Sequence, residues 1–127
     1  MNTAVSGVPR FLLRLEGMAV LATCVVAYRV LGGSWLLFAV LFLVPDLSMV
    51  GYLSGPRAGA AIYNVVHSYV TPALLAGLMA LSILPANWPL CLIWVSHIGF
   101  DRGVGYGLKF TSAFRDTHLG MLNAPAV

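Results

Sequence analysis

A chain of 127 residues that is 60% hydrophobic and only 9% charged is too apolar for a water-soluble domain, in which about a quarter of the residues are charged. Its surface must be solvated mainly by lipid. The formal charge of +3 comes from Lys109 and six scattered arginines, which argues against a basic patch and against nucleic-acid binding.

Four apolar segments are long enough to cross a hydrocarbon core as helices, at roughly 1.5 Å per residue. In chain order they are residues 11–31, 34–53, 58–84 and 88–107. Short breaks rich in Gly, Pro and Asn separate them, so consecutive helices should be antiparallel neighbours. The sequence therefore predicts an all-α fold, in which residues 1–127 form a single integral membrane domain. We expect an up-down four-helix bundle followed by a cytoplasmic tail at residues 108–127.

Basic residues that flank the segments predict the orientation in the membrane. The amino-terminus, the second connection and the tail lie on one side of the predicted bundle. That side holds Arg10, Arg14, Arg57, Arg102, Lys109 and Arg115, whereas the other side holds Arg29. Both termini are therefore expected to face the cytoplasm.

Polar side chains gather near the cytoplasmic end of the predicted helices. Counting from that end at 1.5 Å per residue places five of them at a depth of roughly 8 to 15 Å. They are Glu16, Asp46, His67, His97 and Asp101. Burying an ionisable group at bilayer depth costs several kcal/mol, so such groups usually face the interior and are paired, hydrated or metal-bound.

The spacing within this layer is typical of metal ligands. His97 and Asp101 are four residues apart and share one face of the fourth predicted helix. His67 lies on the third helix, and Asp46 follows Pro45 on the second. Two histidines and two carboxylates suit Zn, Mn or Fe. The alternative is that the same groups form interhelical ion pairs and hydrogen bonds that hold the bundle together.

Other polar residues near this end receive candidate roles. Asp116 and His118 could fold back from the tail, with His118 as a further metal ligand. Glu16 or Asp116 could act as a general base. Arg102 could steady a phosphate or carboxylate in catalysis, and Arg14 could do the same or extend to lipid headgroups. We assign substrate binding to Arg14, Asn64 and Lys109.

Several strings cover nearly the whole chain and resemble one small family of bacterial membrane proteins, called domain of unknown function 4260. They are Leu15-Glu16-Gly17, the stretch from Pro45 to Tyr52, Asn64 to Tyr69, His97 to Arg102, and Asp116 to Gly120. This resemblance implies a bacterial inner-membrane location and supplies no activity.

A more distant similarity links the chain to membrane-bound metal-dependent hydrolases of the YdjM type. It rests on the order Pro-Asp, then His-Ser, then His with Asp four residues later. The resemblance would carry their inferred metal-binding role over to Asp46, His67, His97 and Asp101. Ser48 departs from the pattern, because that group commonly has a second acidic residue there. A two-metal site is therefore in doubt.

The leading hypothesis is a metal-dependent hydrolase that acts on a lipid or other amphipathic phosphoester from the cytoplasmic leaflet, with a divalent ion as cofactor. A small transport or channel subunit that relays protons or an ion is an alternative. A non-catalytic membrane scaffold is another. The lipid bilayer is the expected partner, and a homo-oligomer is left open.

Overall fold

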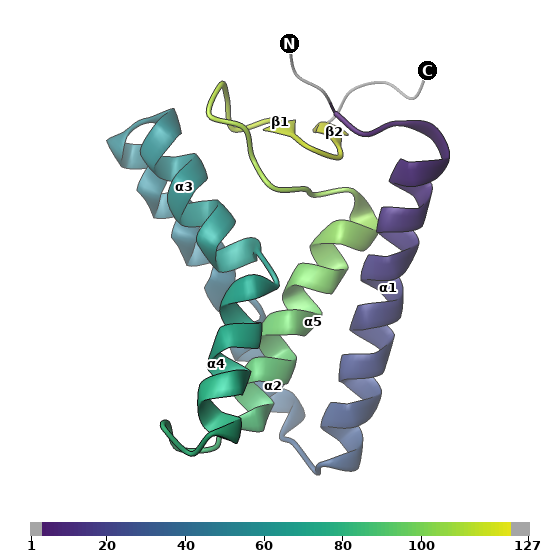
Figure 1. The fold of residues 1–127 in the computed structure, drawn as a ribbon, viewed down its shortest axis with the longest axis vertical. Helices are drawn as coiled ribbons and strands as arrows, with labels where there is room; N and C mark the ends of the chain where they lie inside the picture. The colour runs from purple at the N-terminus through teal and green to yellow at the C-terminus, as the bar shows by residue number, and fades with distance from the viewer. Residues whose placement is uncertain (1–3, 123–127) are drawn as a thin grey trace.

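The computed structural model describes residues 4–122 and is predominantly helical (Figure 1). The α-helices are α1 (Gly7–Val30), α2 (Trp35–Phe42), α3 (Pro56–His67), α4 (Val70–Ala80) and α5 (Trp88–Val104), and a 3₁₀-helix, η1 (Val44–Ser54), follows α2. Two short antiparallel strands, β1 (Asp116–Thr117) and β2 (Gly120–Met121), form a hairpin. The predicted all-α character is confirmed.

The central element is α5, which contacts α1, α2 and α4. Figure 1 shows α1 running away from the end of the molecule that holds β1 and β2, and α5 returning to that end. On the other side of α5, α3 packs along η1. The connection between α1 and α2 is short, and the up-down four-helix membrane bundle stays a prediction.

The second predicted segment, 34–53, is not one uniform helix. It consists of α2 and η1, which meet at Leu43. Pro45 stands at the start of η1 and has no amide hydrogen to donate, so the regular hydrogen-bond pattern of α2 cannot continue through it. The resulting change in helix type sets the position of Asp46, the residue after this proline.

The third predicted segment, 58–84, is also divided, into α3 and α4. Ser68 follows α3 and is extended, with ψ at 140°. Pro72 lies four residues later in α4, where it cannot donate to the Ser68 carbonyl and its ring crowds that group. Pro72 is therefore the sequence signal for this break, and the break leaves His67 as the last residue of α3.

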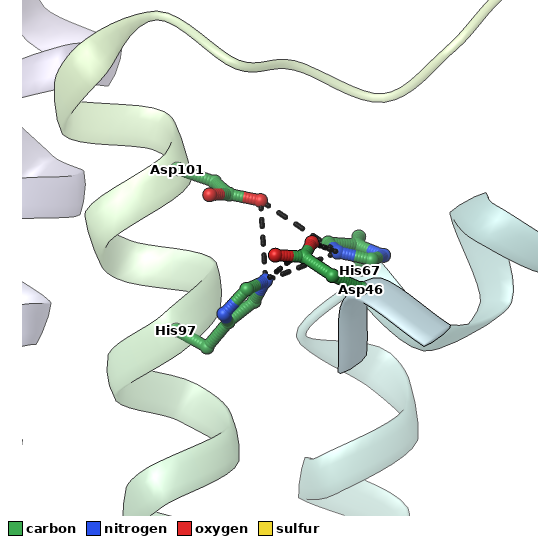
Figure 2. A group of neighbouring side chains, drawn as sticks. All are labelled: Asp46, His67, His97 and Asp101. Atoms are coloured by element: carbon green, nitrogen blue, oxygen red, sulfur yellow. Dashed lines mark hydrogen bonds and ion pairs between the residues drawn. The ribbon is translucent and has the colours of Figure 1, made fainter. Parts of the chain in front are cut away.

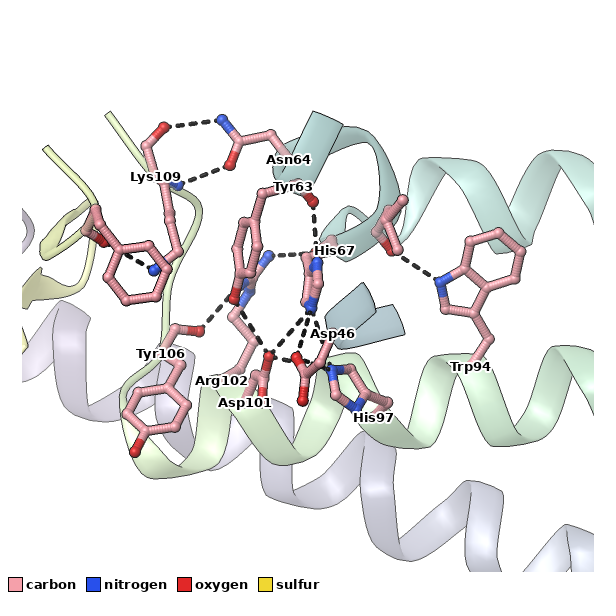
Figure 3. Close-up of polar contacts among 12 residues, drawn as sticks. Asp46, Tyr63, Asn64, His67, Trp94, His97, Asp101, Arg102, Tyr106 and Lys109 are labelled. Atoms are coloured by element: carbon pink, nitrogen blue, oxygen red, sulfur yellow. Dashed lines mark hydrogen bonds and ion pairs between the residues drawn. The ribbon is translucent and has the colours of Figure 1, made fainter. Parts of the chain in front are cut away.

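The carbonyl groups at the carboxyl end of α3 lack partners within the helix and receive them from α5. Trp94 Nε1 donates to the Val66 carbonyl at 2.8 Å, and Arg102 Nη2 donates to the His67 carbonyl at 2.9 Å. Figure 3 shows both contacts. They stabilise an interrupted helix whose last turn is fixed against α5.

Glycines allow α1 and α5 to approach closely. A Cβ atom added to Gly17 would lie 2.8 Å from the Gly99 carbonyl oxygen and 2.9 Å from the Gly103 nitrogen. A Cβ atom added to Gly99 would lie 2.7 Å from the Gly17 carbonyl oxygen. Small residues that let two backbones touch are typical of helix pairs within membranes.

The segment after α5 folds back over the end of the helices, as the sequence allows for Asp116 and His118. Lys109 pairs with Thr117 in an isolated antiparallel bridge. Lys109, Thr117 and Leu119 are all buried. Because these side chains pack against the helical end, the described part of the segment belongs to the folded unit.

Two helical stretches, Gly7–Val30 and Trp35–Ser54, are long and apolar enough to cross a membrane. Large apolar side chains are exposed along them, among them Val30 at 78%, Leu36 at 77% and Leu53 at 88%. Contiguous exposed apolar surface of this kind is unusual on water-soluble monomers. It is the expected surface of a protein in lipid.

Candidate metal centre

Four predicted ligands from three helical elements meet at one point (Figure 2). Asp46 comes from η1, His67 from the last turn of α3, and His97 and Asp101 from successive turns of α5. One potential ligand atom of each lies within 4.8 Å of those of the other three. The structure thus brings together a group of two histidines and two aspartates that could hold a metal ion.

The separations fit the coordination of one ion. The two Nε2 atoms of His67 and His97 are 3.1 Å apart. Asp46 Oδ1 lies 3.4 Å from His67 Nε2 and 3.3 Å from His97 Nε2. Asp101 Oδ2 lies 3.6 Å and 3.4 Å from the same two atoms. Metal–ligand bonds of roughly 2.0 to 2.2 Å place neighbouring tetrahedral ligands about 3.3 to 3.6 Å apart.

The backbone of α3 orients one of the two imidazoles. His67 Nδ1 lies 2.9 Å from the carbonyl oxygen of Tyr63, one turn earlier, and can only donate to it. In the neutral ring Nε2 is then unprotonated and directs a lone pair at the cluster. A backbone carbonyl that accepts from the other ring nitrogen and fixes the tautomer in this way is typical of metal-bound histidines.

A cluster with this tautomer needs a hydrogen-bond donor or a cation at its centre. The lone pair of His67 and the two carboxylates are acceptors, and they converge on His97 Nε2. Either a proton on His97 or a bound cation can satisfy them. A proton on His97 corresponds to the hydrogen-bonded network, and a bound cation corresponds to the metal site. The sequence is compatible with both, and measurement of the metal content distinguishes them.

Aromatic side chains hold the ligands in place (Figure 3). The ring of Tyr63 stacks on that of His67 at 3.7 Å between centroids, and its hydroxyl donates to Asp101 Oδ2 at 3.4 Å. Phe42 packs edge-on against His97. Tyr63 is absent from the site residues predicted from the sequence, although it lies one turn before His67 on the same face of α3.

The cluster forms part of the wall of a cavity of about 310 Å³. His67, His97 and Asp101 are buried, whereas the side chain of Asp46 is 39% exposed. The cavity is lined by Asp46, His97 and Asp101 together with aromatic side chains and Lys109. A molecule that enters it would therefore meet the carboxylate side of the cluster.

Lys109 supplies a positive charge to this cavity. Its Nζ donates to the Phe114 carbonyl at 2.8 Å and lies 3.8 Å from the Phe114 ring centroid and 4.6 Å from that of Tyr63. Burial lowers the pKa of the Lys109 ammonium, and the carboxylates of Asp101 and Asp46 partly offset this effect. The ammonium can thus attract an anionic group towards the cluster.

Asn64, a candidate substrate-binding residue, holds the backbone of Lys109. Its Nδ2 donates to the Lys109 carbonyl at 2.8 Å, and its Oδ1 accepts from the Lys109 amide at 2.7 Å. Both polar atoms of the side chain are therefore engaged. The structure gives Asn64 the task of positioning the segment after α5, outside the residues that line the cavity.

Three other candidates line a cavity on the α1 side of α5, although Arg102 also donates to the backbone carbonyl of His67. Glu16, Arg102 and His118 line a separate cavity of about 410 Å³. His118 Nδ1 accepts from the Leu108 amide at 2.8 Å, so this ring is not one of the converging ligands. Burial and the nearby Arg102 cation lower the pKa of His118. Glu16 is likewise too distant from the cluster cavity to line it.

The remaining candidates also lie outside the cluster. Arg14 Nε donates to the Gly103 carbonyl at 2.9 Å and so joins α1 to the end of α5. Asp116 belongs to β1 and accepts a hydrogen bond from the Ser112 hydroxyl at 2.6 Å. Neither residue lines the cavity at the cluster.

A family model described as Domain of unknown function (DUF4260) matches residues 10–122. The match includes all four residues of the cluster. No curated protein and no solved structure is significantly similar to the chain.

Proposed function

Because the chain belongs to the DUF4260 family, a family of unknown function, we propose its function from the chemistry of the cluster. We propose a metal-dependent hydrolase that crosses the bacterial inner membrane several times, with both termini in the cytoplasm. One observation carries this proposal: two imidazole nitrogens and two carboxylate oxygens converge at ligand spacing, and three of the four residues line a cavity. We also propose that the chain resembles YdjM-type hydrolases in the residues that would bind the metal.

A divalent ion held by these residues would lower the pKa of a bound water and polarise the bond to be cut. A catalytic site needs a coordination position that water or substrate can take. Asp46 is the most exposed of the four ligands and lies on the cavity wall, so this side of the ion is the one that solvent can reach. Asp46 and Asp101 are the carboxylates positioned to accept a proton from that water, in place of Glu16 and Asp116.

The walls of the cavity support an amphipathic anion as substrate. Lys109 offers a positive charge, and Phe42, Phe100 and Phe114 offer apolar surface. A phosphoester that bears an alkyl chain combines both features. Its phosphate would lie between the ion and the Lys109 ammonium, with the chain along the aromatic side chains.

The test of this function is hydrolysis by the purified protein loaded with Zn, Mn or Fe. We expect turnover of alkyl phosphomonoesters or phosphodiesters that a chelator abolishes. Asp46→Asn should lower kcat by about 100-fold or more, because it weakens a ligand that faces the bound water. Asp116→Asn is the matched control and should retain the wild-type rate. Metal-loaded protein that hydrolyses neither class of ester contradicts the proposal.

The proposed orientation has its own test in bacterial cells. Reporter fusions at the carboxyl terminus should give a cytoplasmic signal, and fusions in the connection near Ala86 a periplasmic one, because the basic residues concentrate on the side of the termini. Fusions at the two positions control for each other, since expression alone cannot give opposite signals. A periplasmic signal from the terminal fusion would place the cavity at the cluster in the outer half of the membrane.

A further inference from the structure

The cavity on the α1 side of α5 has a polar composition that the metal centre does not explain. Its volume is about 410 Å³ and its polar wall consists of Glu16, Tyr69, Arg102 and His118, with apolar residues of α1 around them. It shares no lining residue with the cavity at the cluster. We call it the α1 cavity.

Three of these side chains offer hydrogen-bond donors. Arg102 is only 8% exposed, and its recorded hydrogen bonds, to Tyr106 and His67, use two of the five N–H groups of a guanidinium. The Tyr69 hydroxyl is buried and has no hydrogen-bond partner among residues 4–122. His118 accepts through Nδ1, so its neutral ring carries its proton on Nε2. A buried cation with neighbouring donors is suited to an anion such as a phosphate.

Glu16 adds a negative charge to the same cavity. Among residues 4–122, the recorded ion pairs all belong to the metal cluster, so Glu16 has no ion pair with Arg102. Glu16 lies on α1, which is long and apolar enough to cross a membrane. A carboxylate without a cation at bilayer depth costs several kcal/mol. A ligand that brings its own cation would remove this cost.

We propose that the α1 cavity binds the headgroup of a phospholipid that carries an ammonium group. The phosphate is held by Arg102, Tyr69 and His118, and the ammonium by Glu16. The acyl chains follow the apolar surface that Leu13 and Val20 provide at the cavity. The proposal rests on the membrane location proposed above, and it is independent of the metal and of hydrolysis.

Native mass spectrometry of delipidated protein in detergent, titrated with phosphatidylethanolamine or phosphatidylglycerol, tests this proposal. Wild type should bind phosphatidylethanolamine about tenfold more tightly than phosphatidylglycerol. Tyr69→Phe should weaken that binding about tenfold, because it removes a hydrogen bond to a charged group. Glu16→Gln should abolish the preference between the two lipids. Tyr52→Phe is the matched control, since its hydroxyl is also buried without a partner but lies outside the α1 cavity. It should bind as wild type does.

Three results would overturn the proposal: equal binding of both lipids by wild type, an unchanged preference in Glu16→Gln, or equal losses in Tyr69→Phe and Tyr52→Phe. Soluble phosphoethanolamine distinguishes the two sources of the headgroup. If it binds and the lipid does not, the ligand is a free phosphate ester and the lipid assignment is wrong. Metal content, measured on the same samples, reports separately on the proposed hydrolase.

Discussion

Replacing either histidine of the cluster by alanine is expected to reduce bound metal from about one ion per chain to a trace. Loss of a group that only hydrogen-bonds to a ligand typically lowers metal affinity by about 10- to 100-fold, and loss of a ligand itself should cost at least the upper value. His67 and His97 contribute nitrogens 3.1 Å apart. Each variant therefore removes one of the two imidazoles between which the ion would lie. Elemental analysis after purification without chelator and resupply with Zn, Mn or Fe measures the change.

His118→Ala is the matched control for this experiment. It also removes an imidazole, but one that lies in the α1 cavity and outside the cluster. We expect it to keep the metal content of wild type. Circular dichroism should show that all three variants remain helical. If wild type itself holds well below one ion per chain with every metal, the cluster is a hydrogen-bonded network with a protonated His97.

Gly17→Val is expected to destabilise the packing of α1 on α5 by roughly 2 to 4 kcal/mol, because overpacking forces side chains and backbone apart. The first added carbon would already overlap the Gly99 carbonyl and the Gly103 amide, which are backbone atoms that cannot rotate away. It would also meet the Cβ of Arg102, so the end of α5 that carries Asp101 should shift. Denaturant titration in detergent micelles measures the loss.

The control for this substitution is Gly77→Ala in α4. A Cβ atom at Gly77 has no neighbouring atom within 4 Å. Because alanine favours helix over glycine, this variant should be as stable as wild type or up to about 1 kcal/mol more stable. Unfolding of Gly17→Val at the denaturant concentration of wild type would mean that α1 and α5 are not in close contact.

The ligands of the candidate metal centre could be predicted because their signal is local. His97 and Asp101 share a face of any helix that contains both, and Pro45 marks the position of Asp46. Depth along each helix could also be counted, since the rise per residue is fixed. Both inferences follow from backbone geometry alone and need no knowledge of which helices are neighbours.

The direction in which each helix faces could not be predicted in the same way. Glu16 has a suitable depth, yet it lines the α1 cavity, on the other side of α5. Helical depth and direction around the axis are independent, and packing decides direction. The closeness of α1 to α5 depends on three glycines whose partners are distant in sequence. Sequence analysis therefore combined into one layer residues that belong to two cavities.

The sequence by itself determined the helical fold, the apolar surface and four of the five residues proposed as metal ligands, because composition and periodicity are properties of single segments. Only the tertiary structure decided which polar residues meet. It fixed the end of α3 against α5, through the contact of Arg102 with the His67 carbonyl, and it buried Lys109 beside the cluster through its contacts with Asn64. These outcomes depend on contacts between residues 35 and 45 positions apart, whose free energies appear only once the helices are packed.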